Sequence, residues 1–192
     1  GQNSLEDMAA EAAGKGYEYL AITDHSKRLT IAHGQGEKRL RQQMAAIDAL
    51  NMRLRGLTIL KSAEVDILEN GTLDLPDSVL ADLDLVVCAV HSHFQLPGER
   101  QTDRIIRAMG NCHCHVLAHP TGRLLDQRSP YAVDMERVAR AAGELGVWLE
   151  VNAQPARLDL NDVYCRLAQE VGARVVISTD AHSTAQLENM RY

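Results

Sequence analysis

The chain of 192 residues is 45% hydrophobic and 24% charged, a composition typical of a globular protein with one substantial core. Its formal net charge of -6 argues against a domain that grips nucleic acid through a basic face of its own. The sequence offers neither a long apolar run nor a secretion signal, so we expect a cytoplasmic protein with reduced cysteines and no membrane partner.

Short apolar runs alternate along the chain with longer amphipathic stretches, which is typical of β/α units around a parallel sheet. A helix is predicted first, over residues 4–15, with Ser4 as its N-cap and Gly16 after its end. Buried strands are predicted, in chain order, over residues 19–23, 57–66, 85–91, 115–120, 147–153 and 174–179. The helices predicted between them cover residues 37–55, 76–83, 100–109, 134–145 and 161–172.

The two ends of the chain differ from those of a complete barrel. Because the first predicted element is a helix, a barrel built from these units would lack an opening strand. Only a short tail, residues 182–192, follows the last predicted strand. We therefore expect residues 1–192 to be one domain of a longer protein, truncated at both ends.

Residues of metal-binding types end five of the six predicted strands. In parallel β/α folds the ligand site lies at the carboxyl ends of the strands. Imidazoles and carboxylates suit Zn²⁺, Mn²⁺ and Fe²⁺, and a carboxylate such as Glu64 can be shared by two ions. Because so many ionisable groups at one rim are unfavourable without a compensating cation, the pattern predicts a metal centre. The residues at these strand ends are Asp24, His25, Glu64, Asp66, His91, His93, His119, Asp180 and His182.

Other candidates are weaker. The Cys-His-Cys-His run at residues 112–115 lacks the CxxC spacing of zinc sites and enters a strand from its amino end, so we prefer a structural interpretation. Tyr131 and Trp148 are interpreted as core residues. Three residues in loops after strand ends could orient a phosphate or protonate a leaving group, with solvated surface residues as the alternative interpretation. These catalytic candidates are Lys27, His33 and Arg123.

The strand-end motifs resemble those of the polymerase and histidinol phosphatase (PHP) family. The motifs that carry the resemblance are ITDH at residues 22–25, AEVD at 63–66, AVHS at 89–92, AHP at 118–120 and STDAH at 178–182. The strings LTIA at 29–32, HPTGR at 119–123 and EVNA at 150–153 look like the C-terminal PHP domain of bacterial and archaeal family X DNA polymerases.

This resemblance implies an α/β fold, a distorted (β/α)7 PHP-type barrel that here lacks its first strand. It implies a metal-dependent phosphoesterase of the 3′-5′ exonuclease type, which acts on DNA 3′ ends through an attached polymerase region. The complete domain would hold up to three divalent ions (Zn, Mn or Fe). Some family ligands belong to the opening strand, so this fragment alone is expected to hold an incomplete centre. The ligands that the resemblance implies here are His25, Glu64, His91, His119, Asp180 and His182, with Glu64 bridging two ions.

Two other functions stay open. A small-molecule phosphatase of the histidinol phosphate type would use the same ligands, and a non-catalytic module could keep the barrel as a scaffold. The ligand-type residues at the strand ends argue against the scaffold. Because a domain with a net charge of -6 would repel DNA, we expect the polymerase region to supply the grip on the phosphates.

Overall fold

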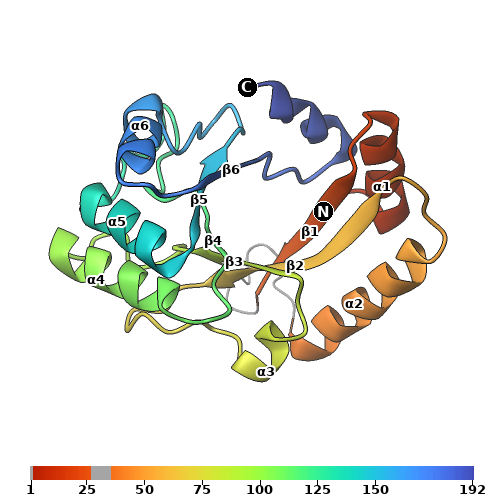
Figure 1. The fold of residues 1–192 in the computed structure, drawn as a ribbon, viewed down its shortest axis with the longest axis horizontal. Helices are drawn as coiled ribbons and strands as arrows, with labels where there is room; N and C mark the ends of the chain where they lie inside the picture. Colours follow the sequence, from red (N-terminus) through yellow and green to blue (C-terminus); the bar gives the residue numbers. More distant parts are fainter. Residues whose placement is uncertain (1, 27–35) are drawn as a thin grey trace.

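The computed structural model describes residues 2–26 and 36–192, and its centre is a parallel sheet curled into an open half-barrel (Figure 1). The strands pair in chain order, from β1 to β6, and each neighbouring pair is parallel. This arrangement confirms the predicted α/β barrel-type fold. The strands are β1 (Tyr19–His25), β2 (Thr58–Asp66), β3 (Leu85–Ala89), β4 (Val116–Leu117), β5 (Trp148–Asn152) and β6 (Val175–Ser178).

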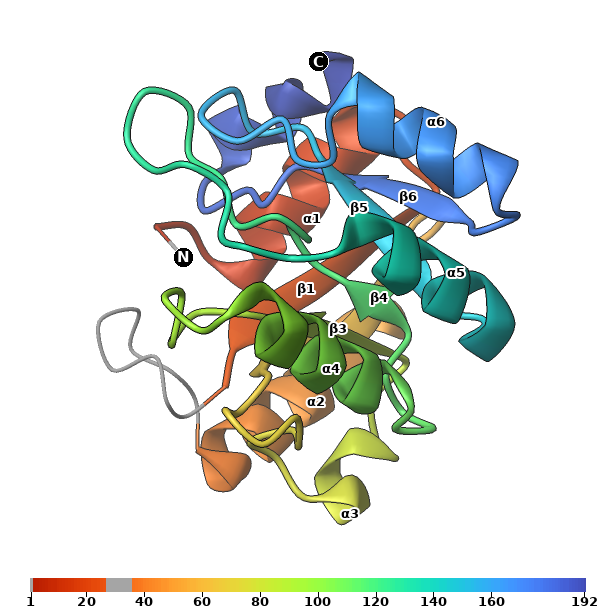
Figure 2. The same cartoon turned by 90° about the vertical axis from the view of Figure 1, so that its left-hand side faces the viewer.

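Helices cover the outer face of the curled sheet. In Figure 1, α1 and α2 lie beside β1 and β2, whereas α4, α5 and α6 lie together on the opposite side. Figure 2 shows α4 and α5 in front of β3, β4 and β5. The part of the chain described by the structure contains no helix long and apolar enough to cross a membrane. The helices are α1 (Leu5–Gly14), α2 (Glu37–Asn51), α3 (Asp77–Leu80), α4 (Gly98–Met109), α5 (Met135–Leu145) and α6 (Asp162–Glu170).

The first helix begins where the sequence predicts because its cap is encoded locally. The Ser4 hydroxyl accepts a hydrogen bond from the Asp7 amide at 3.1 Å, and the Asp7 carboxylate accepts one from the Ser4 amide at 3.2 Å. Gly16 follows the helix with a φ of 78°, a left-handed conformation that glycine adopts without strain.

The sheet buries small apolar side chains on its inner face and larger ones against the helices. The inner cluster consists of Val87, Ala89, Val116 and Ala118 from β3, β4 and the residue after β4. Side chains alternate between the two faces of a strand, so the inner face continues toward the carboxyl ends with polar residues. Thr23, for example, donates to the Ser62 hydroxyl at 3.1 Å across β1 and β2.

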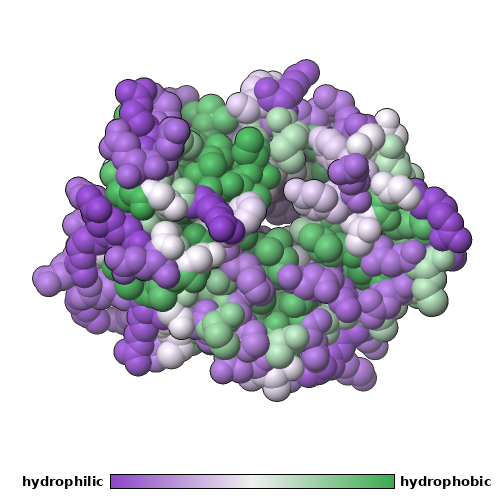
Figure 3. All heavy atoms as spheres, viewed as in Figure 1, coloured by the Kyte–Doolittle hydropathy of each residue, from purple (hydrophilic) through white to green (hydrophobic). Residues whose placement is uncertain are grey.

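Two predictions about burial were wrong. In β6, Val175 is 41% and Ile177 is 55% exposed, since among the described helices none covers the outer side of this edge strand. Trp148, which was interpreted as core, is 38% exposed at the start of β5, and the Arg174 guanidinium lies 5.9 Å from its ring. Figure 3 shows apolar surface around a hollow near the middle of the molecule, as expected for a half-barrel that remains open.

The predicted C-terminal tail is a 3₁₀ helix, η2 (Thr184–Arg191), packed on α1. Leu187 in η2 is 2% exposed, and its carbonyl accepts a hydrogen bond from the Tyr17 hydroxyl at 3.3 Å. The Gln2 amide donates to the His182 carbonyl at 2.8 Å. These contacts hold the segment after β6 beside α1.

Candidate metal centre

The Glu64 carboxylate lies at the middle of the candidate site. His25, the last residue of β1, pairs in register with Glu64 in β2, so both side chains are on the inner face of the sheet. His91 follows β3 and His119 follows β4. Because the carboxyl ends of parallel strands share one rim, these side chains meet there, as the sequence predicts.

The two oxygens of Glu64 face different imidazoles. His91 Nε2 lies 3.0 Å and His119 Nε2 lies 2.9 Å from Oε1. His25 Nδ1 lies 3.2 Å from Oε2. The candidate ligand atoms of His25, Glu64 and His91 are all within 4.8 Å of one another. This carboxylate is thus placed as a ligand shared by two ions would be.

Nitrogen atoms without partners also fit a cation. His25 Nδ1 and His119 Nδ1 are buried and make no hydrogen bond to any residue that the structure describes. The 3.2 Å approach of His25 Nδ1 to Glu64 is therefore close without being aligned as a hydrogen bond. Leaving buried imidazole nitrogens unsatisfied is costly, and coordination is one way to satisfy them. The donor set, imidazole nitrogen and carboxylate oxygen, suits a divalent transition metal.

Asp66 orients His91 from the side opposite Glu64. Its Oδ1 accepts a hydrogen bond from His91 Nδ1, and His91 Nε2 is directed at Glu64. The Asp66 amide is held in turn by the Ser26 hydroxyl at 3.2 Å and by the Asp74 carboxylate at 3.1 Å. A carboxylate behind a ligating imidazole is a common second partner in metal sites. This role for Asp66, which the resemblance left outside the ligand set, was missed from the sequence.

Burial and hydrogen bonding act in opposite directions on the pKa values of Glu64 and His91. Burial alone would raise the pKa of Glu64, but hydrogen bonds and charge from His119 and His91 hold it well below its ordinary value. Burial alone would lower the pKa of His91, but hydrogen bonds to Asp66 and Glu64 raise it to about 9. With protein groups alone, the site therefore holds a proton on His91 that a cation would displace.

The other two predicted ligands, Asp180 and His182, follow β6 and do not contact Glu64 in the described structure. The His182 ring centroid is 6.2 Å from that of His25, and its side chain is 51% exposed. Asp180 Oδ2 accepts a hydrogen bond from Asn152 Nδ2 at 3.3 Å and lies 3.4 Å from Arg157 Nε. The structure thus gathers His25, His91 and His119 around Glu64 and places Asp180 and His182 beside this cluster, at the end of β6.

The remaining strand-end residues and the cysteine run lie elsewhere. Asp24 is on the opposite face of β1 from His25. The His93 side chain is 43% exposed and lies 3.8 Å from the Glu69 carboxylate. His115 Nδ1 accepts a hydrogen bond from the Val86 amide at 3.0 Å, which agrees with the structural interpretation of residues 112–115.

Of the three catalytic candidates, Lys27 and His33 lie outside the described residues. Arg123 donates from Nε to the Arg157 carbonyl at 2.8 Å and from Nη2 to the Leu158 carbonyl. It therefore fixes the loop after β5, and any phosphate contact would fall to its Nη1. Arg157, which was not predicted, carries its half-buried guanidinium to Asp180.

Glu150 supports His119 and was also missed. This carboxylate is 6% exposed and accepts hydrogen bonds from the His119 amide at 2.5 Å, from Asn152 Nδ2 at 3.3 Å and from the Ser178 hydroxyl. Burial raises the pKa of Glu150, although the charge of His119 and the hydrogen bonds from the Ser178 hydroxyl and the His119 amide oppose the rise. His119 has a φ of 27°, so the carboxylate steadies a strained backbone. The sequence signal was a charged residue inside an apolar strand.

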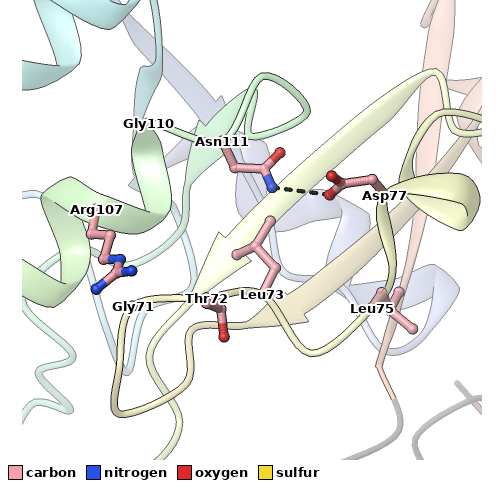
Figure 4. Close-up of a pocket in the computed structure, with 8 residues that line it drawn as sticks. All are labelled: Gly71, Thr72, Leu73, Leu75, Asp77, Arg107, Gly110 and Asn111. Atoms are coloured by element: carbon pink, nitrogen blue, oxygen red, sulfur yellow. Dashed lines mark hydrogen bonds between the residues drawn. The ribbon is translucent and has the colours of Figure 1, made fainter.

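A pocket of 390 Å³ lies outside the sheet, between α3 and the end of α4 (Figure 4). Asn111 Nδ2 donates to Asp77 Oδ1 at 3.2 Å across it. The pocket is lined by none of the predicted ligands, so the chemistry is assigned to the strand ends.

No family model matches the chain. The chain is 44% identical over 191 residues to the DNA polymerase/3′-5′ exonuclease PolX of Bacillus subtilis, with all of this chain but 34% of that protein aligned. It thus spans about a third of that relative. It is 31% identical over 190 residues to a probable phosphatase of Syntrophotalea carbinolica, with 94% of this chain and 74% of that protein aligned.

Its fold is similar to the crystal structure of histidinol phosphate phosphatase from Lactococcus lactis, which was solved with zinc, L-histidinol and phosphate. The TM-score is 0.63 over 99% of this chain and 86% of that one. The two sequences are 13% identical, so this likeness concerns the fold.

Proposed function

Since this chain belongs to the polymerase and histidinol phosphatase (PHP) family, we propose that it is a metal-dependent phosphoesterase domain that hydrolyses DNA from the 3′ end. The family and the cluster of imidazoles and carboxylates support a hydrolase of phosphate esters. The 3′-5′ exonuclease type rests on the name of the Bacillus relative, to which the whole of this chain is similar.

The observation that carries this proposal is the contact of three imidazoles from three strand ends with one buried carboxylate. A carboxylate and several imidazoles this close together are expected where cations bind. His25, Glu64, His91 and His119 would hold the ions, with Asp180 and His182 as ligands on the β6 side. We propose Zn²⁺, Mn²⁺ or Fe²⁺, which share this ligand preference.

In this mechanism the side chains of the protein hold the ions and orient the phosphate. Bound divalent ions would polarise the phosphoryl oxygens and lower the pKa of a bound water. Asp66 keeps the proton of His91 on Nδ1, so that Nε2, which faces Glu64, would be available to an ion. Arg123 fixes the loop after β5, and its Nη1 is the group that we propose to contact the phosphate. Lys27 and His33, which lie outside the described residues, remain predicted substrate contacts.

DNA is proposed as the substrate in the context of a longer protein. The net charge of -6 opposes binding of a polyanion by this domain alone. We therefore propose that residues 1–192 act as one domain attached to a polymerase region, which supplies contacts to the DNA backbone. A small-molecule phosphatase is the second candidate, because the Syntrophotalea relative, most of whose length is aligned, is named a probable phosphatase.

One experiment separates these functions. The longer protein that carries residues 1–192, and its Glu64→Gln variant, are incubated with Mn²⁺ and either a 3′-labelled oligonucleotide or histidinol phosphate. Release of labelled nucleotide by the wild type alone is the expected result. Phosphate release from histidinol phosphate without cleavage of the oligonucleotide would replace the exonuclease with the phosphatase. A protein that consumes neither substrate and purifies without any transition metal would be the scaffold.

A further inference from the structure

Arg104 is a charged residue at a core position of α4. Gln101, Arg104, Ile105 and Ala108 follow the spacing of one helix face, and each is at most 3% exposed. Ile105 and Ala108 belong to the main hydrophobic core, which an aliphatic side chain at position 104 would extend. Packing alone therefore does not account for an arginine here.

The guanidinium of Arg104 joins the ends of two strands. Its Nη2 donates to the Ile67 carbonyl at 2.9 Å and to the Ser92 carbonyl at 3.2 Å. Ile67 directly follows Asp66, and Ser92 directly follows His91. A single nitrogen atom thus links the two backbone segments that carry the hydrogen-bonded pair of Asp66 and His91.

This link is made by a group that is expensive to bury. Arg104 Nε and Nη1 are buried and have no hydrogen-bond partner among the described residues. Burial lowers the pKa of Arg104, and electrostatic interactions with Tyr131, Asp66 and Glu69 oppose that effect. A buried charge with unsatisfied donors usually destabilises a core, so its presence calls for another role.

We propose that Arg104 is a positioning residue of the candidate metal centre. By fixing the carbonyls after Asp66 and His91, it sets how the Asp66 carboxylate meets the His91 ring, and so the direction of His91 Nε2. The part of this inference that concerns metal rests on the proposed function. The contact between Asp66 and His91 does not, because protein groups alone make it.

The first test is the state of the His91 ring in the metal-free protein. Arg104→Met keeps an unbranched side chain but removes the link to both carbonyls. Arg107→Met is the matched control, since Arg107 lies one turn further along α4, exposed beside the outer pocket (Figure 4). In ¹⁵N-resolved imidazole spectra we expect the hydrogen-bonded Nδ1 proton of His91 to shift or disappear in Arg104→Met and to persist in Arg107→Met. An unchanged His91 signal in Arg104→Met would overturn the proposal.

The second test is the binding of Co²⁺ to the same proteins, followed by visible absorption. Partners of ligating imidazoles typically contribute about 10- to 100-fold to metal affinity, so we expect that loss and an altered spectrum in Arg104→Met. Ile105→Val, which removes one buried methylene group at the neighbouring core position, should keep the affinity and spectrum of the wild type. If Arg104→Met and Ile105→Val changed the Co²⁺ affinity and the spectrum equally, Arg104 would be a structural residue and the proposal would fail.

Arg104→Lys covers the case in which the methionine variant does not fold. It retains the charge but not the planar guanidinium, and we expect a smaller change of the same His91 signal. Should the wild type bind no Co²⁺, the proposed function would fail, while the metal-free His91 spectra would still decide the role of Arg104.

Discussion

Replacing Glu64 by glutamine removes one negative charge that three imidazoles contact, with little change in volume. Metal affinity should fall by at least about 100-fold, because even the outer partners of metal ligands contribute about 10- to 100-fold. That factor corresponds to about 3 kcal/mol. A loss beyond about 100-fold would identify Glu64 as a ligand rather than a neighbour of the site, because it exceeds the contribution of outer partners.

The same substitution should change the stability of the metal-free protein in a pH-dependent way. The pKa of His91 is raised from 6.5 to about 9, which corresponds to up to about 3 kcal/mol shared between Glu64 and Asp66. A raised pKa stabilises the fold fully below pH 6.5, and this contribution is lost as the pH rises through about 9. Glu64→Gln should therefore cost about 1–2 kcal/mol near pH 6 and less near pH 9.

The assays are Mn²⁺ titration by calorimetry and urea unfolding at pH 6 and pH 9. Glu69→Gln is the control, because this carboxylate lies shortly after β2 but is 48% exposed and contacts His93 and Arg100. It should leave both quantities within error of the wild type. A Glu64→Gln protein that binds Mn²⁺ as tightly as the wild type would refute the assignment of Glu64 as the shared ligand.

Two further predictions concern protons and glycine. Because a bound ion would displace the proton of His91, Mn²⁺ affinity should rise between pH 7 and about 9 with proton release, measured in buffers of different ionisation enthalpy; a flat profile would contradict this. Gly122 has a φ of 65°, and an added Cβ would lie 2.4 Å from Tyr131 Cε1, so Gly122→Ala should cost about 2–4 kcal/mol in urea unfolding. Gly146 has a φ of 74°, and an added Cβ would meet nothing within 4 Å, so Gly146→Ala should cost about 1–2 kcal/mol. Equal losses of stability in the two variants would show that Tyr131 moves aside in Gly122→Ala.

The clustering of three imidazoles around Glu64 could be predicted because two simple rules combine at the strand ends. Periodicity located β1 and β2, and the rule that parallel strands end at one rim brought His25 to Glu64. The same rule placed His91 and His119 in the loops that converge on it. None of this required knowledge of side-chain packing.

The supporting residues could not be predicted in the same way. Arg104 contacts backbone carbonyls of Ile67 and Ser92, whose directions depend on loop conformations that periodicity does not specify. Glu150 is a hub for donors from three strand ends, but its sequence pattern shows only a charge inside a strand. The exposure of Ile177 was likewise missed, because an apolar run does not reveal whether a helix covers it.

The packing of η2 on α1 has a consequence for how the protein folds. His25 and His182 are separated by most of the sequence, yet they face each other once η2 docks and the Gln2 amide reaches the His182 carbonyl. Closing so long a loop is entropically demanding, and contacts of this kind form slowly. We therefore expect the β6 side of the rim to assemble only after the intervening units have collapsed, so that a divalent ion stabilises the folded domain rather than guiding the early chain.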